Sequence, residues 1–406
     1  MLSRSALIRS FRQATGEGEY NQKHVKTGEP CRAMTTSTLN RRQLNRATLA
    51  RQWLLERVEV SPLEASEHLL GLQAQLPAPP FIGLWTRLHH FHRRALLDLL
   101  HQRKIVRATL MRATLHLVSA ADYVRFRPAL QPALARSLQS FFRRGGDPAV
   151  QTAVLEAARS LLQEGPSTFA VLRQRLAERF PELEPAYIAY LVRMQLPLVQ
   201  VPDQGAWGFS NNPHYAVAFD WLREEGEPWP PEEGLRLLVR RYLAAFGPAS
   251  LNDLQTWSGL GNLKPVLRSM RAELHLYRDE QGQELFDLPD QPLPPADRPA
   301  PVRFLPDFDN VLLAYARRER ILPASYRQAV LLPPGRVLPT ILVDGFVAGI
   351  WTIQRQQGHS KLLITPFTTL SADQGDELLA EGERLLTFLA PQGEAGQSEV
   401  QILRPS

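Results

Sequence analysis

The sequence predicts an α+β fold that is rich in helices and ends in a mixed α/β segment. Several amphipathic stretches begin at a capping residue and end at Gly or Pro, as helices do. One order of three helices and a two-stranded hairpin occurs twice between residues 146 and 287. Near the C-terminus, Asp344-Gly345 separates two apolar runs, which is a strong hairpin signal. These three observations carry the fold prediction.

Length and composition indicate a globular protein. A chain of 406 residues is long enough for about two to four domains, and 44% apolar residues can build sizeable cores. The single cysteine, Cys31, excludes an internal disulfide and a Cys-rich zinc site within one chain. No run approaches the roughly 20 apolar residues that span a bilayer. We expect a protein of the reducing cytoplasm, associated with the nucleoid.

Residues 1–38 are expected to be a disordered extension. Residues 1–33 carry six Lys or Arg against three acidic residues and show little apolar pattern. They could imitate a transit peptide, which is the alternative. Patterned sequence begins only at about Leu39, so Met34 is a candidate start of the native protein.

The net charge of +6 hides a strong asymmetry. Residues 39–145 hold 17 Lys and Arg against 6 Asp and Glu, whereas residues 146–406 carry a balance of −8. Arginine supplies 16 of those 17 cations, and its planar guanidinium suits bidentate contacts with phosphate. A basic domain in an otherwise acidic chain favours a polyanion such as nucleic acid. A solvated, Arg-rich face is the alternative.

The basic domain, residues 39–145, is expected to begin with four helices. Ser61 and Glu64 form a capping box that opens the second of them. That helix stops before Pro77, because the residue before a proline disfavours the helical conformation. Gln73 and Gln75 are therefore expected at its C-terminal end. The four predicted helices are Leu39–Glu59, Pro62–Leu72, Phe81–His92 and Ala95–Gln102.

The run Ile105–Val118 alternates in polarity and is predicted to be one strand. Arg112, Thr114 and His116 would then share one face, and Arg107 lies in the same run. Such a cationic, hydroxylic and imidazole face suits contact with DNA phosphates or base edges. A hydrogen-bonded structural cluster is the alternative.

Residues 146–230 and 231–287 repeat the order of three helices and a hairpin. That order is the winged-helix plan, which is related to the helix-turn-helix. Two copies in one chain strengthen the prediction. The first copy is predicted from Ala149–Gln163, a helix from Ser167 to Phe180, Pro185–Gln195, Leu198–Val201 and Trp207–Phe209. The second is predicted from Glu232–Phe246, Leu251–Trp257, Asn262–Ala272, Leu274–Tyr277 and Glu284–Phe286.

The C-terminal third begins with a linker, because residues 288–301 contain six prolines and no apolar periodicity. Residues 302–390 are predicted to form an α/β segment, and residues 391–406 a frayed tail. The expected elements are a helix Val311–Arg318, strands Thr340–Val343, Phe346–Ile353 and Lys361–Pro366, and a helix from the capping residue Ser371 to Leu389.

Few motifs in this chain carry obvious chemistry. It has no Gly-rich phosphate loop, no HExxH and no spaced Cys/His set, so we expect no metal and no cofactor. Asp307 and Asp309 have a spacing of two, and a metal-dependent nuclease could use such a pair. Capping of the following helix is the alternative, and the better one. The pair Gln73 and Gln75 remains, and neutral amides can only position a water or a polar edge.

Five short motifs occur in order between residues 39 and 390. They are Gly71-Leu-Gln-Ala-Gln75, Met111-Arg-Ala-Thr-Leu-His-Leu117, Tyr242…Phe246-Gly-Pro-Ala249…Trp257-Ser-Gly-Leu260, Leu305-Pro-Asp-Phe-Asp-Asn310 and Val343-Asp-Gly-Phe-Val-Ala-Gly-Ile-Trp351. In this order they resemble the HTH_42 winged-helix family, which includes the AlkZ-type DNA glycosylases that unhook interstrand crosslinks. The resemblance implies tandem winged helices in a C-shaped, DNA-cradling arrangement.

The resemblance also implies site residues. The catalytic motif of AlkZ-like members is Gln, an apolar residue, then Gln, which falls on Gln73, Ala74 and Gln75. Asp307, Asp309 and Asn310 lie in another of the shared motifs and are expected to support the site. Double-stranded DNA with alkylated or crosslinked bases would be the partner, and we expect a monomer. A winged-helix DNA-binding protein without catalysis, such as a transcription regulator, is the alternative.

Overall fold

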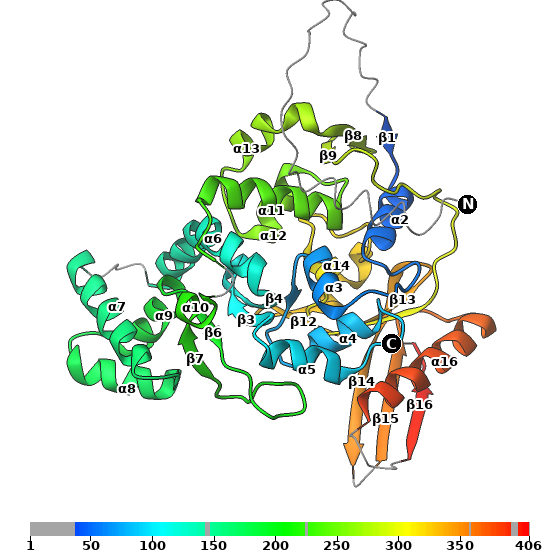
Figure 1. Cartoon of the computed structure of the whole chain (residues 1–406). Coiled ribbons are helices and arrows are strands. Elements are labelled where there is room, and N and C mark those ends of the chain that lie inside the picture. The colour runs from blue at the N-terminus through cyan, green and yellow to red at the C-terminus, as the bar shows by residue number, and fades with distance from the viewer. Residues whose placement is uncertain (1–36, 143–146, 224–225, 357–358, 391–396, 406) are drawn as a thin grey trace, which may run out of the picture. The chain divides into compact units, whose positions relative to one another are not determined.

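Figure 1 shows the computed structural model of the chain. The structure describes residues 37–142, 147–223, 226–356, 359–390 and 397–405. The expectations for residues 1–33 and for Met34 lie outside this part. Residues 37–406 form one compact unit. Among the described residues, no helix is long and apolar enough to cross a membrane.

The first predicted helix is present but shorter than predicted. The helix α2 covers Arg41–Arg51, not Leu39–Glu59. Asn40 caps it in a reciprocal hydrogen-bonded box with Gln43. Trp53 then adopts the left-handed conformation, with φ of 53°, which a right-handed helix does not contain.

The second helix ends earlier than predicted, and this moves both glutamines. The helix α3, Pro62–His68, begins at the predicted cap Ser61. Gly71 is left-handed, with φ of 78°, and turns the chain into the strand β2, Leu72–Gln73. Gln75 follows in a turn. The prediction that both glutamines lie at a helix end is therefore wrong. The next helices, α4 and α5, cover Pro79–Trp85 and Arg93–His101.

The predicted strand Ile105–Val118 is a tight antiparallel hairpin instead. Its strands are β3, Ile105–Thr109, and β4, Leu115–Ser119. A 3-10 turn, Met111–Ala113, joins them, and Arg112 in this turn is left-handed with φ of 55°. The three polar side chains predicted to share one strand face therefore occupy different places: Arg112 in the turn, Thr114 after it and His116 in β4.

A long helix, α6, covers Ala120–Phe141 and was not predicted. Ser119 caps it by accepting a hydrogen bond from the backbone N–H of Asp122. Pro128 and Pro132 lie inside it. Proline removes a helical hydrogen bond and usually breaks a helix, so the sequence pattern conceals this element.

The first predicted repeat is present with one wrong strand. Its helices are α7, Pro148–Gln163; α8, Phe169–Arg179, capped by Thr168 and not Ser167; and α9, Pro185–Gln195. The strand β6, Leu198–Gln200, pairs with β7, His214–Val217, which is followed by the short helix α10, Ala218–Trp221. Trp207–Phe209 forms no strand.

A six-stranded sheet crosses the boundary predicted between residues 145 and 146. Its order is β2-β4-β3-β6-β7-β5, where β5 is Ser167–Thr168. Arg107 and Ala108 of β3 pair with Gln200 and Val199 of β6. The two segments on either side of that boundary therefore share one sheet, and they are not separate bodies as the domain prediction implied.

The second predicted repeat is present in full. Its helices are α11, Pro231–Phe246; α12, Leu251–Ser258, capped by Ser250; and α13, Lys264–Ser269, followed by a 3-10 turn, Arg271–Glu273. Its strands are β8, His275–Asp279, and β9, Glu284–Asp287. β1, Thr38–Leu39, adds a parallel strand beside β8.

The C-terminal segment is built on a five-stranded sheet of order β10-β13-β14-β15-β16, with α16, Ala372–Leu389, packed along it (Figure 1). The hairpin at Asp344-Gly345 and the cap at Ser371 are confirmed. Two predictions are wrong. Residues 398–402 form β16 rather than a frayed tail, and the helix after Asp309 is only α14, Asn310–Leu313. The strands are β10, Arg303–Leu305; β13, Thr340–Val343; β14, Phe346–Gln356; β15, His359–Pro366; and β16, Ser398–Ile402.

Smaller elements lie between β10 and β13. They are the 3-10 turn Ala324–Tyr326, the helix α15, Arg327–Val330, and a two-stranded hairpin of β11, Leu331–Leu332, and β12, Arg336–Val337.

A buried ion pair joins the first helix to the second repeat. Arg51 of α2 donates to both carboxylate oxygens of Asp287, at 2.6 and 2.8 Å, and both side chains are about 1% exposed. The same guanidinium donates to the carbonyl of Leu243. A Cβ on Gly247 would lie 2.6 Å from the Asp287 carboxylate, so only glycine fits beside the pair. This ion pair and the bond to Leu243 fix α2 against residues 231–287, the second repeat.

Asp287→Ala is expected to lower the free energy of unfolding by about 3–5 kcal/mol, because it leaves the Arg51 charge buried without a partner. Chemical denaturation of the purified variant measures this. Glu284→Ala on the same strand removes the exposed partner of Arg271 and serves as the matched control, with little change expected. Equal effects of the two variants would contradict a dominant role for the buried pair.

Candidate active site

Gln73 lies in β2 opposite His116 of β4, with only 6% of its surface exposed. Its side-chain oxygen accepts a hydrogen bond of 2.7 Å from Nη2 of Arg112. Because arginine can only donate, this contact fixes which end of the amide faces Arg112. The amide nitrogen of Gln73 has no hydrogen-bond partner among the described residues, and its N–H groups remain available for substrate or water.

Gln75 lies two residues further on, and its side chain is exposed. Its side-chain oxygen is 3.5 Å from the backbone nitrogen of Leu115, at the limit of a hydrogen bond. Both glutamines therefore lie against the same hairpin, Gln73 through Arg112 of its turn and Gln75 through the first residue of β4. Only Gln75 keeps an oxygen that is free to accept strongly.

Arg107 holds the backbone between the two glutamines. Its Nε donates to the carbonyl of Ala74 at 2.8 Å, and its Nη2 donates to the carbonyl of Gln75 at 3.2 Å. Nη1 donates to the side-chain oxygen of Gln200 at 2.8 Å, and Gln200 in turn donates to the Tyr215 hydroxyl. Burial lowers the pKa of Arg107 to about 10, so it stays protonated at neutral pH. The guanidinium therefore holds residues 73–75, which we call the glutamine loop, in a fixed position.

Arg112 links Gln73 to the second repeat. Its guanidinium donates to the backbone carbonyl of Trp257 and lies over the Trp257 ring, 5.7 Å from the centroid. A Cβ on Gly259, which has φ of 77°, would lie 3.1 Å from the Arg112 Cα, so glycine permits this close approach. Burial, with the nearby charge of Arg318, lowers the pKa of Arg112 to about 10. The end of α12 therefore positions the arginine that orients Gln73.

His116 completes this cluster as a neutral imidazole. Its Nδ1 lies 3.0 Å from the carbonyl of Thr114, which can only accept, so we assign the proton to Nδ1. Nε2 is then an acceptor facing Nη2 of Arg112 at 3.4 Å. Burial and the charge of Arg112 lower the pKa of His116 to about 3.

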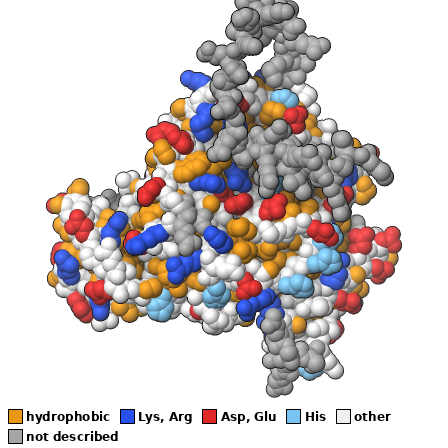
Figure 2. Space-filling view, viewed as in Figure 1, with side chains coloured by type: hydrophobic (Ala, Val, Ile, Leu, Met, Phe, Trp, Pro, Cys, Tyr) orange, Lys and Arg blue, Asp and Glu red, His pale blue; other side chains and the backbone are white. Residues whose placement is uncertain are grey.

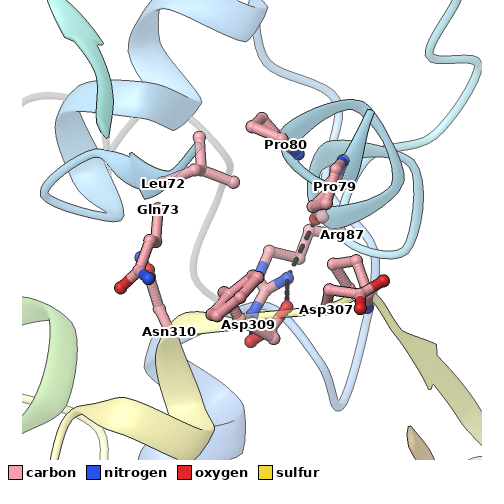
Figure 3. Close-up of a pocket in the computed structure, with 11 residues that line it drawn as sticks. Leu72, Gln73, Pro79, Pro80, Arg87, Asp307, Asp309 and Asn310 are labelled. Atoms are coloured by element: carbon pink, nitrogen blue, oxygen red, sulfur yellow. Dashed lines mark hydrogen bonds and ion pairs between the residues drawn. The ribbon is translucent and has the colours of Figure 1, made fainter. Parts of the chain in front are cut away.

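A small cavity on the other side of β2 is lined by Gln73 and by the motif around Asp309 (Figure 3). Asn310 donates to the carbonyls of Gly71 and Leu69, at 2.6 and 3.3 Å, and so fixes the turn that leads into β2. Asp309 forms a buried bidentate pair with Arg87, at 2.8 and 2.9 Å. Asn310 thus ties the C-terminal segment to the turn before β2, and Asp309 ties it to the turn that follows α4.

Asp307 and Asp309 do not form the carboxylate pair that a nuclease would need. Phe308 between them is left-handed, with φ of 59°, so the chain is not extended there. Asp309 is committed to Arg87 and caps α14 through the backbone N–H of Val311, as the capping alternative predicted. Figure 3 shows Asp307 at the opposite side of the cavity from Gln73. Burial raises the pKa of Asp307, which forms no ion pair with any residue that the structure describes.

Two of the predicted DNA contacts are wrong for this structure. Arg107 and His116 are 4% and 1% exposed, and their polar atoms are bonded inside the protein. Arg112 and Thr114 are half-buried, and Thr114 bonds within its own turn. DNA contact by these last two stays a prediction. The alternative of a hydrogen-bonded cluster describes the arrangement better.

Four further residues belong to this site, although the sequence alone assigned them no role: Arg87, Gln200, Trp257 and Gly259. Trp257 and Gly259 belong to one of the five motifs shared with the AlkZ-like family, but the spacing of residues in that motif indicates no role for them. Arg87 and Gln200 lie in segments that carry no motif, and only the fold brings them to the loop. In the part of the chain that the structure describes, no group of three or more His, Cys, Asp or Glu side chains could hold a metal ion.

Charge is spread unevenly over the molecular surface. Figure 2 shows Asp and Glu side chains gathered over α16 at the right of the view, whereas at the left and centre Lys and Arg side chains are interspersed with Asp and Glu. α16 alone contains five acidic residues and one arginine.

The depressed pKa of His116 predicts a pH dependence of stability. The unfolded side chain titrates near its ordinary value of about 6.5, so between pH 6.5 and 3 the unfolded state binds one more proton at this position. Stability from this group is present above pH 6.5 and is lost as the pH falls. In His116→Gln, the slope of unfolding free energy against pH should decrease by about one proton over this range. An unchanged slope would show that His116 is not buried as a neutral group.

The comparisons with known proteins cover most of the chain. A family model described as DNA glycosylase AlkZ-like matches residues 66–388. A relative from Streptomyces sahachiroi, "Interstrand DNA cross-link repair glycosylase", is 24% identical over 342 residues, which cover 80% of this chain and 90% of that protein. The solved structure "Streptomyces sahachiroi DNA glycosylase AlkZ" superimposes with a TM-score of 0.73 at 22% identity and covers 90% of this chain and 100% of that one. The resemblance to AlkZ-type enzymes is thereby confirmed, while the broader HTH_42 assignment stays a prediction. The chain belongs to the AlkZ-like DNA glycosylase family, whose members hydrolyse N-glycosyl bonds in DNA.

Proposed function

We propose that this DNA glycosylase releases N7-alkylated purines from duplex DNA and unhooks interstrand crosslinks, with Gln73 and Gln75 as its catalytic residues. One observation carries the proposal. Arg112 fixes the side chain of Gln73, and Arg107 holds the backbone beside it, whereas the side chain of Gln75 is exposed. Asn310 of the C-terminal segment fixes the turn that leads to both glutamines. The name of the Streptomyces sahachiroi relative supports the crosslink as substrate.

Neutral residues suffice because the leaving base is already cationic. When the bond between C1′ and N9 breaks, its electron pair neutralises the charge on the purine ring, so no acid has to protonate the base. A neutral substrate would need a general acid as well as a base or nucleophile. Water then adds to the oxocarbenium-like C1′ and loses one proton to solvent. The site must therefore place water and face the sugar cation with a dipole.

The geometry supports a division of work between the glutamines. Arg112 occupies the oxygen of Gln73, which leaves N–H groups to hold an oxygen of the sugar, the phosphate or the water. Gln75 is exposed and has an oxygen that is weakly engaged, so it is suited to accept from the attacking water and to face the positive C1′. Asn310 supports the site through its hydrogen bond to the Gly71 carbonyl, and Asp309 through its ion pair with Arg87. Asp307 lines the same cavity as Gln73.

We further propose that residues 148–217 and 231–287 act as winged-helix units that cradle the duplex. Each has three helices followed by a hairpin. A C-shaped arrangement around DNA follows from the resemblance and stays a prediction, as do the monomeric state and a location in the cytoplasm on the nucleoid. The basic balance of residues 39–145 favours duplex DNA as the partner.

Gln75→Ala and Gln73→Ala are expected to slow base release roughly 100- to 1,000-fold, as loss of one preorganised dipole does. The assay uses a duplex with one N7-methylguanine, or one nitrogen-mustard crosslink, in EDTA, and quantifies the released base. DNA binding should be retained, because neither change removes a charge.

Gln401→Ala is the matched control, since this exposed glutamine lies in β16, outside both proposed winged-helix units. Full activity of the two site variants would contradict the catalytic assignment. Binding by the wild type without any base release would point to a non-catalytic DNA-binding protein, and a strict requirement for divalent metal would point to a nuclease.

The substitution Arg107→Met tests whether Arg107 fixes the glutamine loop. It keeps the apolar stem but removes the donors to Ala74 and Gln75, so the glutamine loop loses its fixed position. Base release should fall about 100-fold, which is the cost of a misplacement of about 1 Å. The slope of log K against log salt should not change, because the buried guanidinium reaches no phosphate. A slope flatter by about one unit would show a phosphate contact instead.

A further inference from the structure

Leu76 directly follows Gln75 and is unusually exposed for its type. It is 48% exposed, one of five large apolar residues exposed in the described part of the chain. Removing a leucine side chain from water is favourable, and the described part of this chain leaves about half of Leu76 in contact with solvent. A partner that covers Leu76 would remove that half from water.

The turn that carries Leu76 is restrained on both sides. Before it, Arg107 holds the carbonyls of Ala74 and Gln75, and the Ala74 nitrogen donates to the Leu115 carbonyl at 2.7 Å. After it come Pro77 and the prolines that open α4, whose backbone φ angles are fixed. An apolar side chain on a preorganised turn loses little conformational entropy on binding.

We propose that Leu76 is a positioning residue that inserts between base pairs beside the nucleotide on which Gln75 acts. This rests on the proposed function. Neighbouring Cα atoms are about 3.8 Å apart, and successive bases of one strand are about 3.4 Å apart, so adjacent residues can address adjacent base steps. Apolar wedges of this kind unstack and kink duplexes.

An inserted leucine would give access to a crosslinked base that cannot leave the helix. A base that is tied to the opposite strand cannot swing freely into a pocket. The small cavity at Gln73 lies among Pro79, Pro80 and Asp309, and is too small to accept a crosslinked purine pair. Unstacking the base in place exposes C1′ to the water held by Gln75 without removing the base from the helix.

The test uses a duplex with 2-aminopurine beside one N7-methylguanine, because 2-aminopurine fluorescence rises when stacking is lost. Wild-type protein should raise the fluorescence on binding and release the base. Leu76→Ala should abolish the rise and slow base release roughly 10- to 100-fold, whereas Leu76→Met, which keeps an apolar wedge, should restore both. Leu293→Ala, at a leucine 37% exposed in the segment after β9 and outside both proposed winged-helix units, is the matched control and should leave both unchanged.

The outcomes separate the two proposals. The proposed function fails if wild-type protein releases no base. The wedge fails, with the function intact, if Leu76→Ala releases base at the wild-type rate or still raises the fluorescence. Gln75→Ala should raise the fluorescence on binding, because its wedge is unchanged, yet release base roughly 100- to 1,000-fold more slowly. Loss of the rise in this variant would show that the turn itself has been disturbed and would overturn the assignment to Leu76.

Discussion

Two arginines without carboxylate partners, the buried Arg107 and the half-buried Arg112, hold the glutamine loop, and the site depends on them. Among the described residues, neither Arg107 nor Arg112 forms an ion pair; each donates to backbone carbonyls and to a glutamine oxygen. Burying a charge with neutral acceptors costs more than pairing it with an acid. A carboxylate here, however, would repel the phosphates of DNA, whereas carbonyl dipoles leave the positive charge uncompensated.

The loop is also the meeting point of segments far apart in the sequence. Trp257 of the second repeat orients Arg112, Gln200 of the first repeat accepts a hydrogen bond from Arg107, and Asn310 of the C-terminal segment fixes Gly71. Mispositioning of any one segment would therefore move the glutamines. The contacts bring three of the four other motifs, those that contain Arg112, Trp257 and Asn310, to the Gln-x-Gln pair.

The sequence could predict the elements but not their convergence. Capping residues and the Asp344-Gly345 turn located helices and hairpins well, because these signals are local. The polarity pattern predicts one strand where the hairpin β3–β4 lies, because alternation of polar and apolar residues does not reveal that Arg112 is left-handed. The prolines of α6 hid a helix that packing stabilises. Arg87 and Gln200 act only through contacts made over long sequence separations.

The same physics accounts for the absence of an acid at the reacting centre. Asp309, the carboxylate best placed to approach Gln73, is neutralised by two hydrogen bonds from Arg87 and used as a helix cap. Its charge cannot compete for DNA-binding cations or act as a base. In the proposed reaction, a cationic purine needs neither a general acid nor a carboxylate base, because its own charge weakens the glycosidic bond. Under the proposed function, selectivity for alkylated bases follows from the chemistry of the two glutamines: an undamaged, neutral purine would require a proton, and neutral Gln73 and Gln75 are not acids that could supply one.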